Sequence, residues 1–303
     1  MLNENLSSWL GHPVIDYAPG TSVRPDTYYR FRIDWDAETS MEELLNAYTA
    51  DPAAAASTGL VIGAWFGDDS QADSTELVRL LADARHALPK LEAIFFGDVI
   101  SEENEISWIN QTDVSPLFEA YPALKHLVVR GGSGLSLGGS RRLESLQSLT
   151  IQTGGLPATV LHEVWALDLP QLESLELWLG TDNYGWDGSL DDLLPLLSGD
   201  LFPSLKHLAL RNSEITDQIA EALVASPLMD RIESLDLSLG TLKDLGAAHL
   251  AGYAGLKRLK SLDLHHHYCT AEGMNALRSA YPGVNLNEKE ELDEDYAYVA
   301  VGE

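Results

Sequence analysis

The sequence predicts an α/β solenoid, a curved stack of strand-and-helix units, and three observations carry that prediction. A short phrase, Leu-x-x-Leu-x-Leu with conservative swaps, recurs as LEAIFF, LKHLVV, LQSLTI, LESLEL, LKHLAL, IESLDL and LKSLDL, at steps of 33, 22, 26, 33, 27 and 27 residues. Apolar and variable residues alternate within each phrase, as in a strand buried on one face. Helical patterns such as TDQIAEALVAS separate the phrases. This period is typical of leucine-rich repeats, with a parallel sheet on the concave side and helices on the convex side.

The repeats set the expected division of the chain. TGLVIGAW and YPGVNLN resemble degenerate first and last repeats, so we expect the solenoid to span residues 57–286. Residues 1–56 contain a strand-like YYRFRIDWD and a helix-like MEELLNAY, which we expect to cap the first repeat because an open solenoid end exposes apolar surface. Residues 287–303 carry seven acidic residues and one lysine, which predicts a mobile acidic tail, with docking onto a basic surface as the alternative.

Composition and charge indicate which classes of partner and which cellular compartment are expected. The 303 residues include 19 basic and 47 acidic side chains, for a net charge of -28, which repels phosphate backbones and anionic lipids. We therefore expect no nucleic acid and no membrane partner, whereas a basic protein or a cation is compatible; solubility alone also explains such a charge. Cys269 is the single cysteine, and the sequence shows neither a secretory pattern nor an apolar run of 18 residues. A cytoplasmic address is expected.

Several longer words lie between Phe95 and Tyr268: FFGDVISEENEISWINQTDV, LVVRGGSGL, GGLPATV, LELWLGTDNYG, LRNSEITD and LDLHHHY. Through these words the chain resembles a bacterial family of leucine-rich-repeat proteins whose activity is unassigned. The resemblance covers the whole repeat region and implies the same fold. It implies no substrate, cofactor or catalytic residue.

Glycine replaces the asparagine that often occupies the ninth repeat position. The glycines are Gly132, Gly154, Gly180 and Gly240. Because glycine permits positive φ there, we expect a reshaped turn after each strand, in place of a conventional asparagine ladder.

The predicted partner surface combines the concave face of the sheet with two insertions. Alternation places Phe95, Arg130, Gln152, Glu176, Trp178, Arg211, Asp236, Asp263 and His265 on the concave side. The insertions GDVISEENEISWINQTD and WLGTDNYGWDGSLDD each follow a strand directly and should project at one rim. From these sets we expect the partner-binding residues to be Asp98, Glu105, Trp108, Arg130, Glu176, Trp178, Asp182, Tyr184, Arg211, Asp236, Asp263 and His265. The alternative is that the tryptophans wedge the long loops against the solenoid.

A metal site is the competing hypothesis. The word DLHHHY places His265 and His267 on one side with Asp263, and Asp236 is one strand spacing away. Carboxylate and imidazole groups bind transition metals, so these four residues are the predicted ligands. Alternation points His266 inward unless the strand has already ended. A structural or partner-contacting histidine cluster is the alternative.

These patterns favour a non-catalytic protein-interaction module that binds a partner protein with a basic surface, without a cofactor. A metal-dependent enzyme or metal-assisted binding protein is the alternative. GGSGLSLGG lacks the Lys-Ser/Thr ending of a phosphate loop, and His162-Glu163 is not followed by a second histidine at zincin spacing. No catalytic residue is predicted. We also expect Trp108 and His265 to lie on one continuous binding surface, because a parallel solenoid gathers equivalent strand ends along one edge.

Overall fold

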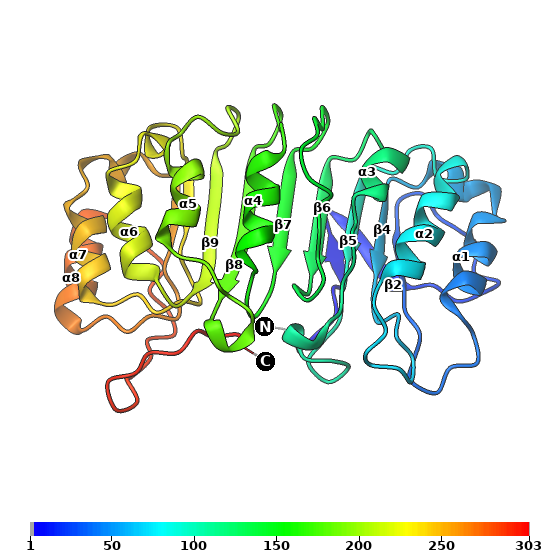
Figure 1. Ribbon diagram of the computed structural model, residues 1–303, viewed down its shortest axis with the longest axis horizontal. Coiled ribbons are helices and arrows are strands. Elements are labelled where there is room, and N and C mark those ends of the chain that lie inside the picture. Colours follow the sequence, from blue (N-terminus) through cyan, green and yellow to red (C-terminus); the bar gives the residue numbers. More distant parts are fainter. Residues whose placement is uncertain (1–2, 303) are drawn as a thin grey trace. The chain divides into compact units, whose positions relative to one another are not determined.

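The computed structural model describes residues 3–302, which contain eleven β-strands and eight α-helices (Figure 1). The chain divides into two compact units, the first ending at Ile151 and the second spanning Gln152–Gly302. Each unit repeats a strand followed by a helical segment, and its strands are mostly parallel. The predicted α/β, solenoid-like architecture is therefore confirmed at this level.

The first unit is a twisted sheet with helices on one face (Figure 1). Its strands are β1 (Ser8–Trp9), β2 (His12–Asp16), β3 (Tyr28–Phe31), β4 (Gly59–Ile62), β5 (Ala93–Phe96), β6 (His126–Arg130) and β7 (Ser148–Gln152), whose last residue begins the second unit. Its helices are α1 (Met41–Thr49), α2 (Thr75–Asp83) and α3 (Pro116–Ala120), with short 3-10 turns η1 (Pro52–Ala56), η2 (Ala84–His86) and η3 (Ile106–Trp108). β1 pairs antiparallel with β2, and each strand from β2 to β6 pairs parallel with the next.

Register aligns the apolar residues of this unit into rows. Tyr29 lies opposite Leu60, Leu60 opposite Ile94, and Ile94 opposite Leu127. All four side chains are fully buried beneath the helices. Burial of such a row supplies most of the stabilisation of a repeat fold, because one repeat alone has no second layer to cover it.

The opposite face of the first sheet is also apolar and is covered by the N-terminal segment. It carries Val14, Tyr28, Val61, Phe95 and Val128. Leu6 and Trp9 pack on this row, and the Trp9 ring meets the rings of Phe95 and Tyr28 edge-on at centroid distances of 5.6 and 5.8 Å.

Residues 3–56 therefore do more than the expected capping. Residues 28–31 and 41–49 do form a strand and a helix, and β3 pairs in register with β4, so the sheet continues from residues 28–31 into the first predicted repeat. In the stretch before β2, Leu6 and Trp9 pack on the sheet face.

The second unit repeats the arrangement, with a buried row made of leucines alone. Its strands are β8 (Ser174–Gly180), β9 (His207–Ser213), β10 (Ser234–Asp236) and β11 (Ser261–Asp263). Its helices are α4 (Ala158–Ala166), α5 (Leu190–Leu197), α6 (Thr216–Val224), α7 (Asp244–Gly252) and α8 (Ala271–Ala280), with 3-10 turns η4 (Asp182–Tyr184), η5 (Pro227–Asp230) and η6 (Ala254–Arg258). Leu175, Leu208, Leu235 and Leu262 lie opposite one another on successive strands, each at most 2% exposed.

Left-handed turn residues in the second unit mostly fall one position before the ninth repeat position. Of the four ninth-position glycines, Gly180 alone has positive φ, 78°. Three consecutive repeats instead place Asn212, Leu239 and His266 in this conformation, with φ of 54°, 66° and 56°. The chain turns there because the amide of each of these residues donates to a carbonyl of the next turn of chain, at Ser238, His265 and Asn287 respectively.

Residues 287–302 fold back on the second unit, and the predicted mobility of the acidic tail stays a prediction. Asn285 donates its amide to Leu262, which adds one more turn beside β11. The chain then returns across the second unit, where Ala300 donates its amide to the Leu239 carbonyl at 2.8 Å and Val301 is 8% exposed. Glu303, also part of the predicted tail, lies outside the described residues.

Across residues 3–302, no helix combines the length and apolar character needed to cross a bilayer.

The leucine row yields the first prediction. Leu208→Ala should lower the free energy of unfolding by about 2–5 kcal/mol, because it removes buried methyl groups and leaves a cavity between two neighbouring leucines. Leu245→Ala, at a side chain that is 63% exposed on α7, is the matched control and should change it by less than about 0.5 kcal/mol. Urea unfolding followed by circular dichroism measures both. Equal effects of the two substitutions would show that the buried face is misassigned.

Candidate functional site

The loops after β3, β4 and β5 enclose a pocket of about 420 Å³ in the first unit, which we call the rim pocket. These loops meet because parallel strands end at the same edge of a sheet. The pocket is lined by Arg32, Ile33, Asp34, Trp35, Ala64, Phe66, Gly67, Asp68, Ser70, Glu102 and Glu103. It therefore combines aromatic, apolar and acidic groups.

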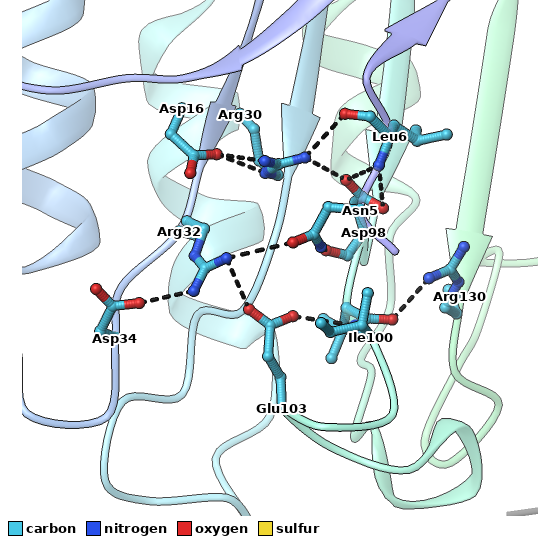
Figure 2. A network of polar contacts seen from close by, with 11 residues as sticks. Asn5, Leu6, Asp16, Arg30, Arg32, Asp34, Asp98, Ile100, Glu103 and Arg130 are labelled. Carbon is cyan, nitrogen blue, oxygen red and sulfur yellow. Dashed lines mark hydrogen bonds and ion pairs between the residues drawn. The ribbon is translucent and has the colours of Figure 1, made fainter. Parts of the chain in front are cut away.

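Charge in the rim pocket is strongly unbalanced. Arg32 is the one basic residue of its lining, and its guanidinium lies 2.7 Å from Asp34 Oδ1 and 3.1 Å from Glu103 Oε1 (Figure 2). Asp68 and Glu102 are exposed. Four carboxylates thus face one guanidinium that already contacts two of them, and the pocket carries a net negative field that favours cations.

Trp35 gives the rim pocket its aromatic wall. Its side chain is 77% exposed, the largest exposure of any large apolar residue in the described chain. An exposed indole beside carboxylates suits contact with a cationic side chain through both area and ring electrostatics. Sequence reasoning missed it by treating YYRFRIDWD as a cap; the available signal was an aromatic residue soon after an apolar strand, where the loops of a parallel sheet gather.

Asp98 was predicted as a rim contact, and that prediction is wrong. Its side chain is 1% exposed, and Oδ2 lies 2.9 Å from Arg30 NH1 and accepts the Leu6 amide at 3.1 Å (Figure 2). Arg30 also contacts Asp16 at 2.6 Å. The buried Asp98 carboxylate therefore fastens the N-terminal segment to the sheet and is not available to a partner.

Arg130 and Phe95 are also buried, contrary to their predicted place on an open concave face. The Arg130 side chain lies over the Phe95 ring, 5.5 Å from its centroid, and NH1 donates to the Val99 carbonyl at 2.6 Å. Burial lowers the pKa of Arg130. The physical reason for the error is the N-terminal cover, since Trp9 occupies the face that alternation alone leaves open.

The loop after β5 keeps two predicted contact residues accessible. Trp108, at the end of η3, is 57% exposed, and Glu105, which precedes η3, is half-buried. The same loop supplies Glu102 and Glu103 to the rim pocket.

In the second unit the outward sheet face carries a ladder of paired charges. Arg211 on β9 lies 3.1 Å from Glu176 on β8 and 3.4 Å from Asp236 on β10, and its Nε donates to Ser238 Oγ at 2.9 Å. Its guanidinium stacks over Trp178, 5.2 Å from the ring. Trp178 is 2% exposed, so its predicted role as a partner contact is wrong.

The pKa values of Asp236 and Asp263 shift in opposite directions, although burial acts upward on both. Burial raises the pKa of Asp236, which Arg211 and Ser238 only partly oppose. At Asp263, burial also acts upward, but hydrogen bonds outweigh it and lower the pKa. These bonds come from the His265 amide at 3.0 Å, from His265 Nδ1 at 2.7 Å and from Asn285 Nδ2 at 3.0 Å.

The predicted metal ligands do not converge. His267 is fully buried; its Nδ1 accepts the Cys269 amide at 3.2 Å, which leaves Nε2 to donate to the Leu286 carbonyl at 3.3 Å. Strand β11 ends at Asp263 and His266 adopts positive φ, so alternation no longer places His265 and His267 on one side. Among residues 3–302, no three His, Cys, Asp or Glu side chains are arranged to hold a metal ion. The four-residue metal hypothesis is therefore wrong.

The second insertion is split between exposed and buried residues. Asp182 is exposed and its amide lies 3.4 Å from Glu214 Oε2, while Tyr184 is half-buried. Trp186 is 3% exposed, as the wedge alternative states. Trp108 belongs to the first unit and His265 to the second, so their joint surface stays a prediction.

Among solved structures, the chain is similar to a Bacteroides fragilis protein whose crystal structure was determined by a structural-genomics consortium. The sequences are 29% identical, the TM-score is 0.82, and the match covers 90% of this chain and 76% of the other. No protein-family model matches the chain. No curated protein matches it significantly. The fold is thus shared with a bacterial protein of unknown function.

The lowered pKa of Asp263 yields the second prediction. Its carboxylate stabilises the fold above its ordinary pKa of 3.8, and this contribution is lost as pH falls through the lower folded value. Asp263→Asn should therefore lower the free energy of unfolding at pH 7 and change it much less at pH 3. Urea unfolding at both pH values measures this, with the exposed Asp36→Asn as control. An equal loss at pH 3 and pH 7 would contradict the assignment.

Proposed function

We propose that the chain is a non-catalytic protein-interaction module built of leucine-rich repeats, and that it binds a basic partner protein through the rim pocket. The observation that carries the proposal is Trp35, 77% exposed on the wall of a pocket that holds four carboxylates and one arginine. Binding energy at protein interfaces concentrates in aromatic side chains seated beside a pocket. A Lys or Arg side chain of the partner fits this combination of ring and carboxylates.

Charge balance favours the rim pocket over the other polar surface. In the second unit, Arg211 already offsets Glu176 and Asp236, so an incoming cation gains less there. At the rim pocket, Asp68 and Glu102 are exposed and face solvent. The net charge of -28 adds long-range attraction for a basic partner.

The loop after β5 supports an area larger than the pocket. Trp108 and Glu105 lie on the same loop as Glu102 and Glu103, so acidic and aromatic groups continue beyond the pocket along this loop. A protein interface needs such a surface around its central anchor. Glu105 and Trp108 are therefore the proposed periphery of the contact.

The third prediction tests the anchor. The full chain is used to retain proteins from an extract of its native cell, and the affinity of the retained protein is then measured. Trp35→Ala should weaken that affinity by roughly 30-fold, with an unchanged salt slope, because it removes mainly contact area. Glu102→Gln should weaken it less and should flatten the salt slope, because it removes a charge.

Leu245→Ala is the matched control, since it removes an exposed leucine from α7 in the second unit. It should leave the affinity unchanged. A retained protein that binds wild type, Trp35→Ala and Glu102→Gln equally would rule out the rim pocket, and failure of wild type to retain any protein would remove the proposal's support.

A further inference from the structure

Three equivalent turn residues form a regular row along the second unit. Asn212, Leu239 and His266 follow one another at 27-residue intervals, and all three have positive φ. We call them the corner ladder. Because β9, β10 and β11 pair in parallel, equivalent residues should repeat about every 4.8 Å along this edge.

Residues 296–302, which we call the strap, bind this row one residue after another. His266 Nε2 donates to the Tyr298 carbonyl at 3.1 Å. The Ala300 amide donates to the Leu239 carbonyl at 2.8 Å. The Asn212 side chain then holds the backbone of Val301 from both sides, since Oδ1 accepts the Val301 amide at 2.9 Å and Nδ2 donates to the Val301 carbonyl.

The spacing of residues along the extended strap matches the spacing of the ladder residues. Two strand spacings amount to about 9.6 Å, and three residues of extended chain advance about 10 Å. An extended peptide that crosses the strand ends can therefore contact each successive repeat. The main chain of the strap supplies most of the contacts, so the ladder recognises mainly an extended backbone and depends less on side chains.

The positions of Val301 and Gly302 also restrict which side chains fit. Val301 is 8% exposed, whereas Tyr296 and Tyr298 are 66% and 58% exposed. A Cβ on Gly302 would lie 2.5 Å from Cε2 of the Tyr184 ring, so a larger residue does not fit without movement. The ladder thus selects an apolar residue followed by glycine.

The strap is held by few buried groups. Val301 is its one buried residue, and the preceding turn places the non-glycine residues Glu294 and Asp295 at positive φ, 48° and 80°, which is unfavourable. Little apolar burial and an unfavourable turn make this segment the readiest part of the second unit to open.

We propose that the corner ladder is a peptide-binding groove, that the strap occupies it as an intramolecular ligand, and that an extended segment of a partner protein with an apolar residue followed by glycine displaces the strap. This surface lies in the second unit, and the proposal is independent of the rim pocket. The strap itself shows which chemistry the groove accepts.

The test uses the full chain and a fluorescein-labelled peptide with the strap sequence, YAYVAVG. In wild type, the amides of Ala300 and Val301 should be protected from hydrogen exchange, and peptide binding should be weak. Val301→Asp should expose both amides and strengthen peptide binding at least tenfold, because a carboxylate cannot replace the buried valine. Adding Asn212→Gly, which keeps the left-handed conformation but removes the amide, should reverse that gain at least tenfold.

A second peptide, YAYVADG, controls for side-chain recognition and should not bind any variant. The proposal is overturned if Val301→Asp leaves the strap amides protected, if it exposes them without gaining peptide affinity, or if both peptides bind equally. Light scattering of wild type adds a further check, because a dimer formed by strap exchange would make a second copy the occupant in place of a partner protein.

Discussion

In-register pairing of parallel strands is the constraint on which the rest of the structure depends. Leu208 lies opposite Leu175 and Leu235, and every other position must then stack on its own equivalent in the next repeat. For leucines this stacking is favourable, but it also brings Asp236 directly opposite Asp263. The chain accommodates the like charges through Arg211 on one side and through the His265 and Asn285 hydrogen bonds on the other.

On the outward sheet face of each unit, the apolar and charged side chains are largely covered or paired by other residues of the same chain. In the first unit, the buried Arg30–Asp98 contact holds a segment whose Trp9 covers the apolar row (Figure 2). In the second, Arg211 pairs with carboxylates on both neighbouring strands. The groups proposed to bind partners lie where strands end: the exposed carboxylates of the rim pocket, and the corner ladder after the strap leaves it. This is why both proposals concern turns and not the sheet face.

Local pattern was sufficient to predict the repeat strands, the buried leucines and helices such as α1 and α8. It failed where a distant segment decides the environment. Phe95 and Arg130 alternate outward as expected, yet Leu6 and Trp9 lie over them, and no local periodicity reports such a cover. His267 failed differently, because β11 ends early and the positive φ of His266 breaks the alternation.

Oxidative footprinting of the tryptophans in the full chain tests most directly the central claim that the sheet faces are covered and the strand-end loops are open. Trp35 and Trp108 are 77% and 57% exposed, whereas Trp178 is 2% exposed beneath Arg211. Brief exposure to hydroxyl radicals followed by peptide mass spectrometry should therefore show rapid oxidation of Trp35 and Trp108 and slow oxidation of Trp178. Oxidation of Trp178 as fast as that of Trp35 would contradict the claim, because the outward face would then be open to solvent.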